Sequence, residues 1–116
     1  MSGFIYEREN NDYLCSSSSN GYINIWDLYN KTIFKIINTY NCELYHIIEW
    51  NSKYIIVADC NNKSFKIIDL EENKIICDIN GEHNGNVKCI KKINHPLYGE
   101  SLLSVAKDNT IKLWII

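Results

Sequence analysis

The stretch Asp108-Asn-Thr-Ile-Lys-Leu-Trp114 is the third copy of a short pattern that recurs along this chain. Residues 20–28 (NGYINIWDL) and 62–70 (NKSFKIIDL) have the same order of turn residues, apolar residues and a strand-ending Trp or Ile. Positions 26, 68 and 114 are 42 and 46 residues apart. This is close to the period of about 40 to 45 residues at which four-stranded sheets repeat in ring-shaped proteins. The three copies are therefore interpreted as one structural unit used repeatedly.

Short runs rich in β-branched and aromatic residues alternate with clusters of Asn, Gly, Asp and Ser, which is typical of antiparallel strands joined by turns. The strands are expected at 4–7, 13–17, 22–26 and 32–37 in the first copy, at 44–49, 53–58, 64–68 and 74–79 in the second, and at 87–93, 101–106 and 110–114 in the third. Most of the extra length of the third copy is placed at 95–99. Apolar runs such as 33–34 and 36–37 predict strands that are buried on both faces.

The charge and the short apolar runs of the chain argue against two classes of partner, nucleic acids and membranes. The net charge is −2 and Lys91-Lys92 is the only basic pair, so we expect no nucleic-acid binding. The longest apolar runs, such as residues 54–58, are far shorter than the roughly 20 residues that span a bilayer, so we expect no membrane insertion. No secretory signal is visible at residues 1–3, and a cytoplasmic or nuclear protein is expected.

The five cysteines are odd in number and have no Cys-x-x-Cys spacing, which argues against a disulfide framework or a structural zinc site. Cysteines within strands behave as small apolar residues, which suits a reducing compartment. No metal and no cofactor is expected.

Four residues of the third copy stand at characteristic spacings. His83, in Gly81-Glu82-His83, precedes the first strand, Ser104 lies in the second, Asp108 in the next turn, and Trp114 ends the third strand. This arrangement resembles the WD-repeat β-propeller family. In that family the corresponding residues form a hydrogen-bonded network inside each blade, the four-stranded sheet that is the unit of the ring. The resemblance implies this structural role for the four residues named here.

The other copies follow the family pattern less closely. The first keeps Ser16, Asn20 and Trp26, with an amide in place of the carboxylate. The second has Tyr40, Ala58, Asn62 and Ile68 at the four positions, so packing alone is expected to hold that blade. Asp27 and Asp69 follow the strand-ending residue, as the family name implies, whereas Ile115 follows Trp114.

A catalytic interpretation of Ser104, His83 and Asp108 as nucleophile, base and orienting group is disfavoured. A nucleophile needs a hydroxyl exposed to a cleft, whereas Ser104 lies within an apolar strand, and the chain has no Gly-x-Ser-x-Gly elbow. We expect no enzyme activity and no catalytic residue.

The resemblance implies an all-β fold of three four-stranded antiparallel blades of a WD-repeat β-propeller, partial or open, whose last blade lacks its outer strand. One domain is expected over residues 4–116, with blades at about 4–38, 44–80 and 87–116, and with residues 1–3 left over from cloning. Rings close with roughly four to eight blades, so three leave two apolar faces bare. The chain is expected to be the C-terminal part of a larger propeller. Self-association through the exposed faces is the alternative.

WD-repeat proteins are mostly non-enzymatic scaffolds, so the resemblance implies that this chain binds other proteins or peptides. A substrate-recognition domain within an enzyme complex, such as a ubiquitin ligase or phosphatase assembly, is the alternative. A phosphoinositide-binding propeller would need paired arginines, and Arg8 is the only arginine. The candidate partner-binding residues lie on the expected docking surface formed by the turns between second and third strands and between successive blades: Tyr40, Glu43, Ser19, Asn61, Asn86 and Lys107.

Overall fold

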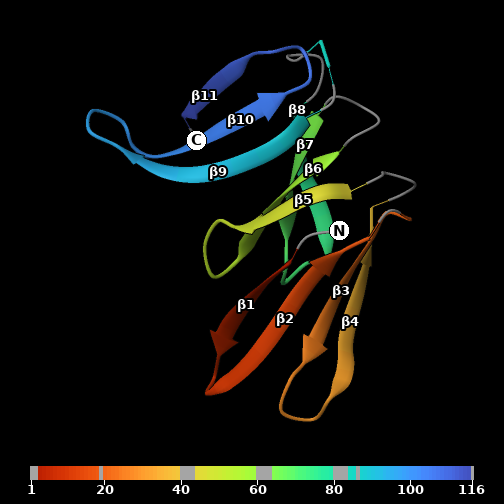
Figure 1. The fold of residues 1–116 in the computed structure, drawn as a ribbon. Helices are drawn as coiled ribbons and strands as arrows, with labels where there is room; N and C mark the ends of the chain where they lie inside the picture. The colour runs from red at the N-terminus through yellow and green to blue at the C-terminus, as the bar shows by residue number, and fades with distance from the viewer. Residues whose placement is uncertain are drawn as a thin grey trace.

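The computed structural model describes residues 3–18, 20–39, 44–59, 64–79, 84–85 and 87–115. Within these residues eleven strands form three antiparallel sheets, and consecutive strands of each sheet lie side by side (Figure 1). The sequence-based expectation of an all-β chain with sheets of four, four and three strands is confirmed.

The first sheet contains β1 (Gly3–Arg8), β2 (Asn11–Ser17), β3 (Tyr22–Asp27) and β4 (Thr32–Asn38). The second contains β5 (Leu44–Glu49), β6 (Tyr54–Asp59), β7 (Ser64–Asp69) and β8 (Lys74–Ile79). The third contains β9 (Val87–His95), β10 (Gly99–Ala106) and β11 (Ile111–Ile115). Every predicted strand is present with ends shifted by at most two residues, which is the usual uncertainty of strand ends. β1 begins at Gly3, one residue before the predicted start of the domain.

The extra length of the third copy extends a hairpin. β9 and β10 remain paired as far as His95 and Gly99, so the inserted residues lengthen both strands and close in a turn at Pro96 to Tyr98. Gly99 has φ of 71°, a left-handed conformation that glycine adopts without strain. The insertion therefore leaves the rest of the sheet in register.

The sheets follow one another in chain order, with the second between the first and third (Figure 1). The first strand of each sheet contacts the first strand of the next, because β1 contacts β5 and β5 contacts β9. This arrangement of inner strands is the one that the propeller resemblance implies.

One apolar core lies between the first and second sheets. Cys15, Ile23 and Ile25 of the first sheet are fully buried there, together with Ile55 and Val57 of the second. Burial raises the pKa of the Cys15 thiol to about 12, so this cysteine stays a neutral apolar side chain. At roughly 2 kcal/mol for each buried aliphatic side chain, this interface is the main attachment between the two sheets.

A second core joins the second and third sheets. Phe65 of β7 contacts Trp114 of β11 edge to face, with ring centres 4.9 Å apart, and Ile90 and Leu102 of the third sheet are buried beside them. Lys92 of β9 adds a polar link, because its ammonium donates to the backbone carbonyl of Trp50 at 2.5 Å. Of the basic pair at 91 and 92, only Lys91 is exposed.

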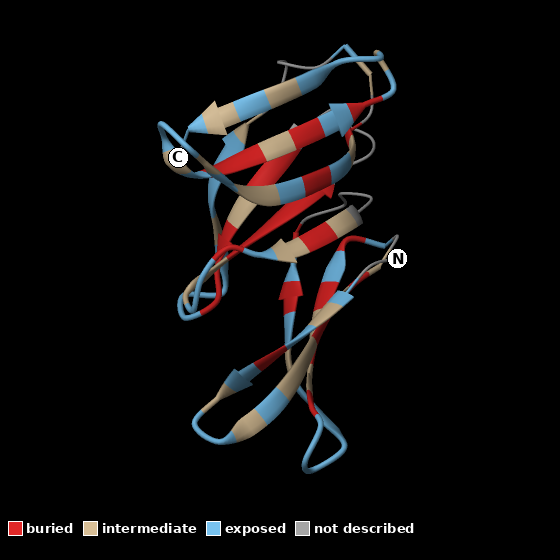
Figure 2. Cartoon of the chain, turned by 60° about the vertical axis from the view of Figure 1, so that its left-hand side comes forward, coloured by how far each residue is buried: buried red, intermediate tan, exposed pale blue. Residues whose placement is uncertain are grey.

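The outer faces of the first and third sheets are exposed. One position can be compared across the three sheets, namely the residue three places before positions 26, 68 and 114. In the first two sheets it is buried, with Ile23 0% and Phe65 1% exposed. In the third sheet it is Ile111, which is 69% exposed. On the first sheet Ile33 and Ile36 are also exposed, and Figure 2 shows exposed residues along the outer strands. The expectation that residues 33–37 are buried on both faces is thus wrong for this sheet, because no sheet covers its second face among the described residues.

His46 connects β5 to β9. Its Nδ1 accepts the backbone N–H of Ile90 at 3.2 Å, and burial lowers the pKa of His46 below its ordinary value of 6.5. Because Nδ1 accepts a hydrogen bond only when it is unprotonated, the neutral ring is the form that joins the sheets.

The stability of the chain should therefore fall on mild acidification. The folded pKa of His46 is depressed, so its contribution is fully present above about pH 6.5 and is lost as the pH falls through the lower folded value. The His46→Gln variant keeps an acceptor that does not titrate in this range. Urea unfolding at several pH values between 7 and 5 should show a smaller loss of unfolding free energy in this variant than in the parent. Equal losses would contradict the role of His46.

Candidate functional site

The third sheet brings together two of the residues predicted for the hydrogen-bonded network. The indole Nε1 of Trp114 donates to Ser104 Oγ at 2.8 Å, and Ser104 is fully buried. The spacing of ten residues places them on adjacent strands of the same face, since Leu102 pairs with Trp114 and Ser104 lies two residues further along β10. A buried hydroxyl that accepts an indole N–H has no access to a substrate, which argues for a structural role for Ser104.

Asp108 fastens two segments of the chain. Its Oδ2 accepts the backbone N–H of Asn84 at 2.8 Å, and its Oδ1 accepts the backbone N–H and hydroxyl of Thr110 at 3.0 and 2.5 Å. Gly85 lies against the same turn, where a Cβ would come within 2.6 Å of the Asp108 nitrogen. The carboxylate thus holds the segment before β9 on the β10–β11 turn. His83 lies outside the described residues, and its predicted role stays a prediction.

The first sheet contains a weaker version of the same pair. Trp26 Nε1 donates to Ser16 Oγ at 3.4 Å, and Ser16 is only partly buried. Asn20 stays within its own turn, where its Oδ1 accepts the hydroxyl of Ser18 and the backbone N–H of Tyr22. Ser16 and Trp26 therefore meet as predicted, and Asn20 serves as a local turn cap.

In the second sheet the position equivalent to Ser16 and Ser104 is one residue away from the predicted one. Ile55 pairs with Ile68, and Val57 follows it on the same face, whereas Ala58 points to the opposite core. The cause is one extra residue between the paired positions, because 12 residues lie between Ile55 and Ile68 but 11 lie between Leu14 and Trp26 and between Leu102 and Trp114. Val57 and Ile68 are both fully buried, so packing holds this sheet, as expected.

Of the predicted partner-binding residues, the structure describes Lys107 alone. It is exposed in the turn between β10 and β11. The other five predicted residues lie outside the described residues: Tyr40, Glu43, Ser19, Asn61 and Asn86. The docking surface at these turns stays a prediction.

A groove of about 290 Å³ lies at the opposite ends of the strands, between the first and second sheets. It is formed where the β1–β2, β5–β6 and β7–β8 turns approach the start of β4. The lining residues combine aromatic, basic and acidic side chains: Tyr6, Arg8, Glu9, Tyr13, Phe34, Lys35, Ser52, Leu70 and Glu71.

Aromatic rings form one wall of this groove. Tyr6 stacks on Tyr13 with ring centres 5.5 Å apart, and Tyr13 contacts Phe34 at 5.1 Å. Phe34 is the extra residue at an irregularity in the β3–β4 pairing, between Ile33 opposite Trp26 and Lys35 opposite Ile25, and it is 56% exposed. Bulges of this kind redirect a side chain, here toward the groove.

Two cations lie on these rings. The Arg8 guanidinium carbon is 5.1 Å from the centre of the Tyr6 ring, and Lys35 Nζ is 5.7 Å from that of Phe34. Lys35 also donates to the carbonyl of Leu70 across the groove. Burial lowers the pKa of Lys35, and the nearby Asp69 carboxylate opposes this effect. Burial raises the pKa of Tyr6 to about 12.

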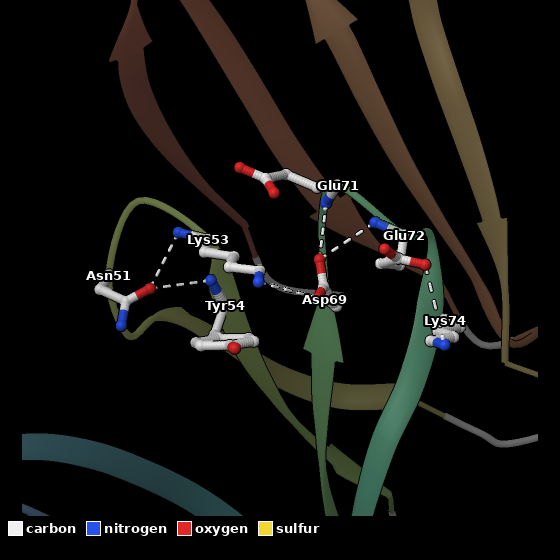
Figure 3. A network of polar contacts seen from close by, with 7 residues as sticks. All are labelled: Asn51, Lys53, Tyr54, Asp69, Glu71, Glu72 and Lys74. Atoms are coloured by element: carbon white, nitrogen blue, oxygen red, sulfur yellow. Dashed lines mark hydrogen bonds and ion pairs between the residues drawn. The ribbon is translucent and has the colours of Figure 1, made fainter.

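The second wall is fixed by hydrogen-bonded turns (Figure 3). Asp69 Oδ1 accepts the backbone N–H groups of Glu71 and Glu72 at 2.8 and 3.0 Å, and Lys53 is 3.7 Å from Asp69 Oδ2. Asn51 Oδ1 accepts two backbone N–H groups of the neighbouring turn in the same way. The backbone N–H of Glu72 is the main cause that holds the pKa of Asp69 below its ordinary range.

Asp27 has the same function in the first sheet. Its carboxylate accepts the backbone N–H and the side-chain amide of Asn30 and the side-chain amide of Asn11. The backbone N–H of Asn30 is the main cause of the lowered pKa of Asp27. The Asp that follows the strand-ending residue is therefore a turn cap in both sheets, and it shapes the end of the molecule at which the groove lies.

This groove was not predicted from the sequence. Arg8 was considered there only as an unpaired arginine, and the lining residues are far apart along the chain. The available signal was that Arg8, Tyr6 and Tyr13 flank one hairpin on the same face, since Tyr6 pairs with Tyr13. Within the described residues no group of His, Cys, Asp and Glu side chains is placed to hold a metal ion, and no helix there has the length and apolar character needed to cross a membrane.

Comparison with known families agrees with this architecture. Residues 74–114 match the family model described as WD domain, G-beta repeat. The match runs from β8, the outer strand of the second sheet, to Trp114 in β11, so one sequence repeat extends over parts of two sheets. Residues 74–114 therefore carry a WD40 repeat. WD40 repeat domains are generally protein-interaction scaffolds and usually non-catalytic. No curated protein matches the chain.

Replacing the two indoles by phenyl rings should have unequal effects. Trp114→Phe removes the donor to the buried Ser104, and we expect a loss of unfolding free energy of about 1 kcal/mol or more. Trp26→Phe should cost clearly less, because its bond to Ser16 is long and the hydroxyl is partly open to solvent. Urea unfolding of both variants checks this. Equal losses would rule out the proposed difference.

Proposed function

We propose that this chain is a non-enzymatic scaffold that binds other proteins or peptides, and that the groove between its first two sheets takes part in binding. The groove supports this proposal because tyrosine, phenylalanine and arginine are enriched where proteins bind one another. An exposed Phe34 beside stacked tyrosines offers apolar area at low entropic cost. The predicted surface around Lys107 is the second candidate, at the other end of the strands.

The exposed sheet faces support a further proposal about assembly. A sheet that buries only one of two apolar faces needs another sheet beside it, so we propose that these three blades belong to a larger WD-repeat ring. The three described free cysteines, Cys15, Cys77 and Cys89, suit the proposed cytoplasmic or nuclear location.

A substrate-recognition role within an enzyme complex remains the alternative function. The groove would serve it equally well, since recognition needs the same contacts in both cases. The identity of the captured proteins separates the two, because only the alternative predicts that catalytic subunits are recovered along with the groove ligand.

Affinity capture with matched variants tests the scaffold proposal. The parent chain, Phe34→Asp and Tyr29→Asp should be compared as baits by mass spectrometry. Tyr29 is 83% exposed in the β3–β4 turn but does not line the groove, so it controls for a general loss of exposed aromatic surface. Partners held by the groove should be lost with Phe34→Asp and kept with Tyr29→Asp. Partners lost instead with Lys107→Glu would assign binding to the other end of the strands.

The exposed faces should also cause self-association at high protein concentration. Sedimentation of the parent should show species larger than the monomer, and Ile111→Lys should reduce them because it places a charge on the bare face of the third sheet. Leu97→Lys is the control, since Leu97 is equally apolar and 81% exposed in a turn. A parent that stays monomeric would contradict the prediction.

A further inference from the structure

Arg8 has a hydrogen-bond donor that nothing in the described chain uses. Its Nη2 is the one buried side-chain nitrogen or oxygen of the described residues that lacks a hydrogen-bond partner. A buried donor of a charged group that makes no hydrogen bond is costly, and such donors are rare in folded proteins. The guanidinium is meanwhile held in place by its contact with the Tyr6 ring. Nη2 itself is buried, but Arg8 as a whole is only partly buried and lines the groove, so its guanidinium is an oriented cation there.

The other cation of the groove is already engaged. Lys35 donates to the carbonyl of Leu70, so it contributes charge but is tied to the second wall. Asp69 is directed to its own turn, where it accepts two backbone N–H groups. The carboxylates that line the groove, Glu9 and Glu71, are exposed. The groove is thus lined by an oriented arginine and aromatic rings, with negative charge among its exposed lining residues.

We propose that this groove binds a peptide through a single carboxylate side chain, which accepts hydrogen bonds from Arg8 while a neighbouring apolar side chain packs on Tyr13 and Phe34. Arginine is suited to this role because its planar donors match the two oxygens of a carboxylate. Glu9 and Glu71 repel densely charged ligands such as nucleic acids and multiply phosphorylated segments. They favour instead an acidic residue flanked by neutral or basic residues. This inference rests on the proposed scaffold function and specifies its ligand.

The test uses four-residue peptides that are acetylated and amidated at their ends. Lys-Glu-Phe-Lys supplies the carboxylate, the aromatic ring and basic flanks, and Lys-Gln-Phe-Lys lacks only the charge. In NMR titrations the Glu peptide should shift backbone signals of groove residues, and the Gln peptide should bind about tenfold more weakly or worse, as expected for loss of a charge-assisted hydrogen bond. Arg8→Gln should abolish the difference between the two peptides, and Lys107→Gln should leave it unchanged.

A second measurement separates binding from folding. Arg8→Gln removes an unsatisfied donor, so its thermal unfolding should match or exceed that of the parent even though the peptide preference is lost. Arg8→Lys keeps the charge without the planar donor pair and should retain only part of the preference. A merely structural Arg8 would instead lower stability in both variants and leave the preference intact.

Several outcomes would overturn the inference. These are equal binding of the Glu and Gln peptides, an unchanged preference in Arg8→Gln, or tighter binding of a phosphoserine peptide than of the Glu peptide. If any of them occurs while Phe34→Asp still loses its partners in affinity capture, the carboxylate specificity fails and the scaffold function stands. If Phe34→Asp loses nothing and neither peptide binds, both fail.

Discussion

The structure depends on the need of the second sheet to bury both of its faces. Ile55 and Ile56 are consecutive residues of β6 whose side chains point to opposite faces, and both are fully buried. A sheet of this kind is not stable alone, because each apolar face left in water forfeits the main driving force for folding. The first and third sheets are therefore required for the second. Neither of them has a second neighbour among the described residues.

Strand positions could be predicted from the sequence because they depend on local composition. β5 and β8 match their predicted ranges, since β-branched runs and turn residues mark both ends. Pairing across strands was harder to predict. Ala58 was predicted at the position equivalent to Ser16 and Ser104, but one extra residue between Ile55 and Ile68 puts Val57 there instead. Because side chains alternate every residue, a single added position exchanges the two faces.

The groove could not be predicted for a different reason. The groove forms because the β1–β2 and β7–β8 turns lie opposite each other. These turns are about 60 residues apart in the chain, so their proximity follows only from the stacking of the sheets. Phe34 illustrates this point. In the sequence it belongs to an apolar run that indicates a buried strand, but an irregular pairing turns it outward beside Tyr13. The family motif, by contrast, consists of residues that maintain the sheets, and it carries no information about such surfaces.

Arg8 shows how the scaffold and the groove are linked. Turn caps at Asp27 and Asp69 satisfy local backbone donors, and the free oxygen of Asp69 is paired with Lys53 rather than with Arg8. The guanidinium is held on the Tyr6 ring, and its Nη2 has no hydrogen-bond partner among the described residues. A fold that used Asp69 for Arg8 would be locally better paired but would lose the turn that forms the second wall. The way the turns are stabilised therefore leaves the Arg8 guanidinium at the groove without a pairing to Asp69, and its charge there is complementary to an external acid.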